Sequence, residues 1–179
     1  MDLEQCNFLT EDLLITILPR MRLEVEKIDG ILLEFEPRVP IEVPVWIAMF
    51  LRKKQKCTVI PPVWLTVDEL NRISQAEADS TVFTEIPERF FELSHILITQ
   101  CQEDLENLEQ LRTLVKDIWD KRSSKMRTST MGLFEAGTAG HIKLNGITQF
   151  EIAHSRDFIL DASSTLGKLS NVYLSIDEY

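Results

Sequence analysis

The sequence predicts an α+β protein that is mainly α-helical, with a small β-rich domain over residues 1–62 and a helical domain over residues 63–170. Two observations support this order. An Asp-Gly pair at residues 29–30 separates two apolar runs and supplies the positive backbone angles of a tight β-hairpin. After the Pro-Pro pair at residues 61–62, apolar residues recur every three or four positions, which is the period of amphipathic helices.

The first domain is expected to contain this hairpin and one buried helix. Residues 3–12 favour a short helix before the hairpin. Apolar and charged residues then alternate over residues 21–26, which is the period of a half-buried strand. Pro37 and Pro40 are expected to end the extended structure.

The buried helix is predicted over residues 44–51, which are almost all apolar, with Pro44 in its first turn. A short strand is predicted over residues 57–60. The basic residues between the two are Arg52, Lys53, Lys54 and Lys56. The simpler interpretation is that they complement the negative end of the helix dipole and aid solubility. Contact with nucleic-acid phosphate is the weaker alternative.

The second domain begins with two predicted helices. The first opens at Thr66, which can form a capping box with Glu69, and it runs to about residue 78. Pro87 suits the first turn of the second helix, whose apolar residues recur on one face as far as residue 101.

Two longer helices are predicted to follow, over residues 105–126 and residues 147–169. Between them, residues 128–146 contain four glycines among Ser, Thr and Ala, which predicts a loop. Residues 171–179 are expected to form a loose C-terminal tail.

The most informative segment is residues 111–122. It combines an apolar side at helical spacing with a charged side, and the simpler interpretation is an ordinary amphipathic helix. However, the apolar faces of the predicted helices are too wide for so small a chain to cover, and tryptophan is favoured at the centres of protein interfaces. The candidate protein-contact residues are Trp46, Leu111, Arg112, Val115, Lys116, Ile118, Trp119 and Arg122.

Composition narrows the classes of function. The net charge of -10 disfavours direct DNA binding, because that binding requires a broad positive field. Cys6, Cys57 and Cys101 are odd in number and far apart, as expected of free thiols in a reducing compartment. The N-terminus is acidic, unlike a secretory signal, and the longest strongly apolar stretch, residues 43–51, is too short to span a membrane.

No motif indicates an active site, a metal site or a bound cofactor. The histidines His95, His141 and His154 belong to no His-Glu-x-x-His or paired-cysteine pattern, so a zinc site is unsupported. The sequence also has no phosphate-binding glycine loop and no Gly-x-Ser-x-Gly elbow. An enzyme whose acidic residues converge only in three dimensions stays open.

Three blocks carry a resemblance to a known family. They are Ile-Glu-Val-Pro-Val-Trp at residues 41–46, Gln-Lys-Cys-Thr-Val-Ile-Pro-Pro-Val-Trp at residues 55–64, and Arg-Thr-Leu-Val-Lys-Asp-Ile-Trp-Asp-Lys-Arg at residues 112–122. Such long runs with Trp and Pro at fixed spacing are specific. From about residue 8 to residue 169, the chain resembles the PSF-two type of the GINS family.

The resemblance implies a nuclear, non-catalytic scaffold with no cofactor. Such a subunit would form a heterotetramer with three related GINS subunits and join the MCM ring and a RecJ-like factor into the replicative helicase, where ATP chemistry belongs to the ring. The glycine-rich residues 128–146 depart from the charged, helical character expected of the family there. The alternatives are an acidic soluble enzyme and an adaptor of another intracellular assembly.

Overall fold

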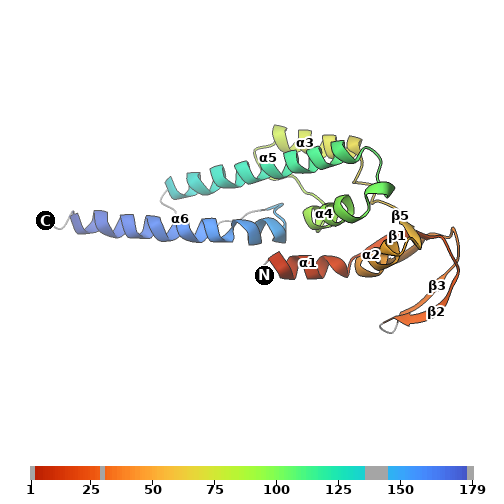
Figure 1. Cartoon of the computed structure of the whole chain (residues 1–179). Helices are drawn as coiled ribbons and strands as arrows, with labels where there is room; N and C mark the ends of the chain where they lie inside the picture. Colours follow the sequence, from red (N-terminus) through yellow and green to blue (C-terminus); the bar gives the residue numbers. More distant parts are fainter. Residues whose placement is uncertain (1–2, 29–30, 136–144, 177–179) are drawn as a thin grey trace.

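The computed structural model describes residues 3–28, 31–135 and 145–176 (Figure 1). It begins with α1 (Leu3–Glu11), followed by short strands that enclose one helix and then by helices as far as the end of the described chain. The predicted α+β class, with the small sheet before the helices, is confirmed.

The central strand of the main sheet is β1 (Leu14–Pro19), which pairs antiparallel with β4 (Ile41–Pro44) on one side and β5 (Cys57–Val59) on the other. Alternate residues of β1 are buried, so Ile15 and Ile17 enter the core while Leu14 stays exposed. The apolar run in this part of the sequence therefore serves as a half-buried strand.

The hairpin is confirmed as β2 (Leu23–Ile28) paired antiparallel with β3 (Ile31–Phe35). Its expected turn residues, 29–30, lie outside the described residues. These two strands form a sheet separate from the main one, and Figure 1 shows them at the end of the molecule opposite the C-terminus.

The expectation that extended structure ends at the prolines is wrong, because pairing resumes in β4 directly after Pro40. This strand lies at a sheet edge, where proline is tolerated. The buried helix α2 (Val45–Lys53) starts one residue later than predicted. Pro44, with a φ of -55° and a ψ of 145°, ends β4 and precedes the helix instead of occupying its first turn.

The helical half starts with α3 (Val67–Asp79), where the Thr66 hydroxyl accepts from the Glu69 N–H, as predicted. The next helix, α4 (Phe90–Gln100), begins three residues after Pro87, because Arg89 adopts a left-handed conformation with a φ of 56°. A short 3-10 turn, η1 (Gln102–Asp104), leads towards the long helix α5 (Leu108–Glu135), and α6 (Gln149–Ile176) is equally long.

The long helices exceed their predicted lengths. Helix α5 continues to Glu135 through part of the predicted glycine-rich loop, and α6 continues to Ile176 through most of the predicted loose tail. Glycine costs only about 1 kcal/mol inside a helix, and a Thr hydroxyl can bond to a carbonyl one turn earlier, as Thr128 does to Ser124. The rest of that loop, residues 136–144, and the end of the tail, residues 177–179, lie outside the described residues.

The hydrophobic core runs without interruption from the main sheet through α2 and α4 into α5. It includes Ile17 and Ile47 from the first half and Leu97 and Ile118 from the second, all with almost no exposure. Helix α3 packs along α5, and α1 packs against α4 and α6. The core therefore crosses the expected boundary at residue 62. The division of the chain into two domains at that residue stays a prediction.

None of the described helices is both long and apolar enough to cross a membrane.

Candidate protein-interaction surface

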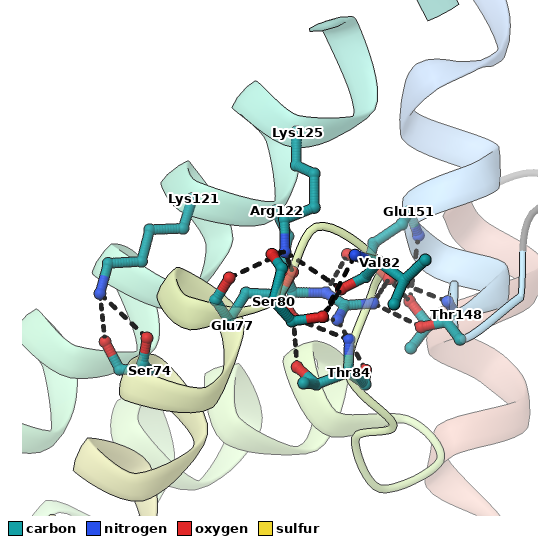
Figure 2. A network of polar contacts seen from close by, with 11 residues as sticks. Ser74, Glu77, Ser80, Val82, Thr84, Lys121, Arg122, Lys125, Thr148 and Glu151 are labelled. Atoms are coloured by element: carbon teal, nitrogen blue, oxygen red, sulfur yellow. Dashed lines mark hydrogen bonds and ion pairs between the residues drawn. The ribbon is translucent and has the colours of Figure 1, made fainter. Parts of the chain in front are cut away.

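A buried arginine connects three helical segments (Figure 2). Arg122, on α5, is fully buried; its Nη1 donates to Glu77 Oε2 of α3 at 2.9 Å and its Nε donates to Glu151 Oε1 of α6 at 2.6 Å. The remaining donors reach Glu151 Oε2 and the backbone carbonyls of Thr84 and Gly146. The planar guanidinium thus fixes the start of α6 against α3 and α5.

Two lysines extend this network along α3. Lys125 Nζ lies 2.5 Å from Glu77 Oε1 and also donates to the carbonyl oxygens of Glu77 and Ser80. One turn earlier on α5, Lys121 donates to the carbonyl and hydroxyl oxygens of Ser74. The lysines therefore satisfy acceptors towards the C-terminal end of α3, where a cation is also favoured by the helix dipole.

The charged groups of the network are held in their ionised forms. Burial alone would raise the pKa of Glu77, but hydrogen bonds from Lys125 and Thr84, with the charge of Arg122, hold that pKa below its usual range. Burial likewise disfavours the charged form of Arg122, but Glu151 and Glu77 raise its pKa. A carboxylate held in this way is suited to anchoring, because a proton donor or acceptor needs a pKa near the working pH.

A reciprocal capping box fixes the start of α6. The Thr148 hydroxyl accepts from the Glu151 N–H at 3.3 Å, and Glu151 Oε2 accepts from the Thr148 N–H at 2.8 Å. Its Thr-Gln-Phe-Glu sequence is the signal by which this start could have been found, although the pairing of Glu151 with Arg122 has no local signal.

Aromatic side chains from two other helices pack against Trp119. Its ring lies 5.0 Å from Phe91 of α4 and 5.6 Å from Phe150 of α6, both edge-on, and 5.0 Å from His154. Edge-to-face pairs of this kind add to the energy of burial. The tryptophan of α5 is therefore partly buried among helices of its own chain.

The predicted protein-contact residues do not form one exposed face. Leu111, Ile118 and Arg122 are buried inside the chain, and their contact with a partner stays a prediction. Their apolar spacing reports core packing. Trp46, Val115 and Trp119 are partly buried and pack against the core, and only Arg112 and Lys116 are exposed.

One of the four candidate phosphate contacts, Arg52, is used inside the chain. Arg52 is buried, and its Nε lies 2.7 Å from Asp104 while its Nη2 lies 2.8 Å from Glu103. Asp104 in turn accepts from the Val59 N–H at 3.1 Å, so the arginine connects α2 and β5 to η1. Burial and these two ion pairs disfavour contact between Arg52 and nucleic-acid phosphate.

The neighbouring lysines remain accessible. Lys53 and Lys54 are exposed and Lys56 is partly exposed. The Lys54 ammonium lies 4.0 Å from the centre of the Phe50 ring, a cation–π contact. The structure thus separates one structural arginine from three surface lysines in the same basic run.

Of the two long helices, α6 carries the large apolar side chains that are exposed to water. Ile152, Phe158 and Leu160 have exposures of 44%, 44% and 56%, and they are called the α6 apolar surface below. At 3.6 residues per turn, Phe158 and Leu160 lie on nearly opposite sides of the helix. Figure 1 shows α6 extending beyond α5, away from the strands. The sequence offers a signal for this surface, because Phe158 and Leu160 lie outside the apolar face of the helix that contains Ile159.

In the part of the chain that the structure describes, no group of three or more His, Cys, Asp or Glu side chains is placed to hold a metal ion.

The fold and these surfaces define a small antiparallel sheet followed by a bundle with long helices. Residues 64–169 match the GINS complex protein helical bundle domain, and residues 2–60 match the PSF2 N-terminal domain. The chain belongs to the PSF2 family of GINS proteins.

Relatives match along nearly the whole chain. The human DNA replication complex GINS protein PSF2 is 36% identical over 171 residues, which cover 94% of this chain and 92% of the human protein. The probable DNA replication complex GINS protein PSF2 of Caenorhabditis elegans is 33% identical over 169 residues, which cover 93% of each chain.

Proposed function

We propose that this chain is the PSF2-type subunit of a GINS complex and acts in DNA replication in the nucleus as a non-catalytic scaffold. Its direct partners would be three related GINS subunits in a heterotetramer. The assembly would join the MCM ring and a RecJ-like factor into the replicative helicase. Family membership along almost the whole chain supports the role as a PSF2-type subunit in DNA replication. The resemblance to GINS subunits supports the proposed partners.

The observation that carries the proposal is the α6 apolar surface. Its apolar side chains face water on opposite sides of a helix whose start is anchored by Arg122 and Glu151. Leaving such side chains in water is unfavourable, and burial is worth about 25 cal/mol per Å² of apolar area. A helix that is rigidly held at one end and apolar on two sides is suited to insertion between partner helices.

The accessible residues among the earlier candidates remain part of the proposal as contacts to partners. They are Trp46, Arg112, Val115, Lys116 and Trp119. Lys53, Lys54 and Lys56 remain weak candidates for phosphate contact, and direct DNA binding by this acidic subunit is proposed to be minor.

The test is co-expression of the full chain with the three sibling GINS subunits, followed by size-exclusion chromatography with light scattering. The proposal expects a stable complex with one copy of each subunit. A well-folded monomer that elutes apart from all three siblings would contradict it and favour the alternative of an unrelated adaptor or enzyme.

A further inference from the structure

A pocket lies between the start of α4 and the segment that leads into α6. Its volume is about 300 Å³. The charged and polar side chains that line it are Glu85, Glu88, Arg89, Glu92, Thr148 and Gln149. Three carboxylates and one guanidinium give the lining an excess of negative charge. The pocket borders the buried Arg122 network, because Gly146, whose carbonyl accepts from Arg122, and Thr148, whose N–H donates to Glu151, also line it.

Glu92 is the unusual member of this lining. It is 2% exposed, and its Oε1 lies 3.5 Å from Arg89 Nη1, which is long for a charge-assisted hydrogen bond. Among the described residues, Glu92 Oε2 is the one buried side-chain nitrogen or oxygen without a hydrogen-bond partner. Burial raises the pKa of this carboxyl, which reflects the missing compensation of its charge.

The contrast with the other buried acids is informative. Glu77 and Glu151 are equally buried, and each receives two or more short hydrogen bonds from cations or backbone N–H groups. An unpaired buried polar atom costs about 1–3 kcal/mol, and more when it is charged. The nearby cations thus pair with Glu77 and Glu151, whereas Glu92, which lines the pocket, keeps one buried carboxylate oxygen without a donor.

We propose that this pocket receives the cationic side chain of an arginine or lysine from a partner protein, which donates to Glu92 Oε2. A cation would supply the missing donor and offset the excess of carboxylates. The volume is sufficient for a guanidinium or ammonium group. This inference rests on the proposed function, because it takes the partner to be a subunit of the same assembly.

The position of the pocket relative to the exposed apolar residues supports a protein occupant. Thr148 and Gln149 belong to the start of α6, the helix that carries the α6 apolar surface. On the other side, Arg89 donates to the Cys6 carbonyl of α1, and α1 exposes Phe8 and Leu9. A partner that covers the start of α6 would thus meet the exposed Ile152, one turn after Thr148, together with the acidic pocket, an arrangement that suits a cation anchored at an interface.

The test compares Glu92→Gln with Glu88→Gln in the full chain. Both remove one carboxylate from the pocket lining, but Glu88 is exposed and Glu92 is buried. The melting temperature of each isolated chain and its affinity for the three sibling subunits would be measured. We expect Glu92→Gln to keep the melting temperature and to weaken assembly about tenfold or more, and Glu88→Gln to change affinity less than about twofold.

Two outcomes would overturn the inference in distinguishable ways. If the wild-type chain fails to assemble, the proposed function fails and the inference fails with it. If the wild-type chain assembles and Glu92→Gln binds equally well, only the pocket inference fails. Should Glu92→Gln not fold, Glu92→Met removes the same charge at similar volume and is judged by the same two outcomes.

Discussion

At the scale of single residues, Arg122 of α5 connects α3 and α6 through hydrogen bonds to Glu77 and Glu151. It donates to five acceptors: two oxygens of Glu151, one oxygen of Glu77 and two backbone carbonyls. Arginine is suited to this position because its planar fork offers five donors and stays charged when buried. A lysine could not reach acceptors in so many directions.

Replacing Arg122 by methionine should lower the free energy of unfolding by about 3–5 kcal/mol, because Glu151 is then left buried without its counter-charge and Glu77 keeps only Lys125. Urea unfolding of the purified chain measures this. Arg112→Met is the matched control on the same helix. Arg112 forms only an exposed pair with Glu109, so its loss should cost about 0.5 kcal/mol or less. Equal losses for the two variants would contradict the anchoring role.

Acid should weaken the same network through Glu77. Because its pKa is lowered in the folded chain, its contribution is present above the unfolded pKa and is lost as the pH falls through the folded value. We therefore expect stability to fall as the pH drops below about 4.5, the ordinary value. The slope of unfolding free energy against pH should be smaller in Glu77→Gln. An unchanged slope would show that Glu77 does not contribute to the pH dependence of stability. Glu106→Gln, at an exposed position, is the control.

At the scale of elements, Arg52 joins the sheet side of the molecule to the helical side. It extends from α2 to Glu103 and Asp104 in η1, and Asp104 also holds the first-half strand β5 through Val59. The pKa of Arg52 is raised by the hydrogen bond to Glu103 and by Asp104, against the opposing effect of burial. The connection between the halves is thus polar as well as apolar.

Arg52→Ala should destabilise the chain by about 1–3 kcal/mol, because Asp104 loses a charged donor while it stays almost fully buried. Lys53→Ala, one residue further on the exposed side, should change stability by less than about 0.5 kcal/mol. Thermal unfolding of both variants measures the two losses of stability. Equally small effects of the two substitutions would mean that Arg52 is only a surface charge, and would contradict its connecting role.

Neighbouring residues of helix α5 differ sharply in burial: Lys116 is exposed, Ile118 is buried and Trp119 is partly buried. Ile118→Asp should unfold the chain, because it places a carboxylate in a fully buried apolar site without a partner. Trp119→Ala should cost less than the roughly 3–5 kcal/mol of a fully buried tryptophan, since its ring is partly exposed. Lys116→Asp is the exposed control. Circular dichroism with denaturant titration measures all three, and a folded Ile118→Asp chain would contradict the core assignment.

The elements that could be read from the sequence are those specified by neighbouring residues. The Asp-Gly hairpin, the Thr66 cap and the order of strands and helices all have local causes. The edge strand β4 was missed because its pairing with β1 is not local. The ends of α5 and α6 were placed too early because Gly, Ser and Thr lower helix propensity only slightly, which the continuing helix tolerates.

The candidate site was less predictable for a related reason. The partners of Arg122 lie 45 and 29 residues away, and Asp104 lies 52 residues from Arg52, so no spacing rule connects them. A buried charge and an exposed charge look alike in a helical wheel. The family, by contrast, could be recognised from three blocks of Trp and Pro, because such runs are specific without any knowledge of contacts.

At the scale of the whole molecule, the chain is packed at one end and extended at the other. The sheet, α2, α3 and α4 enclose the core with α5, while α6 continues past them (Figure 1). The Arg122 network and the Thr148 capping box lie where α6 leaves the packed part. This arrangement gives the projecting helix a fixed direction, which reduces the entropy lost when a partner binds it.

Phe158→Glu and Leu160→Glu should each weaken assembly with the sibling GINS subunits by about tenfold or more while leaving the melting temperature of the isolated chain nearly unchanged. Both side chains are exposed, so a charge there is harmless in water and costly only when a partner must bury it. Arg156→Glu, an exposed charged position on the same helix, is the matched control. Light scattering of the co-expressed complex provides the measurement.

The pattern of the two losses tests how α6 is held. Since Phe158 and Leu160 lie on nearly opposite sides of the helix, losses in both variants would mean that partners enclose α6. A loss in only one would mean that a single partner face covers one side and leaves the other in water. If neither variant weakens assembly, the α6 apolar surface is not the contact, and the partly exposed residues of α5 become the next surface to test.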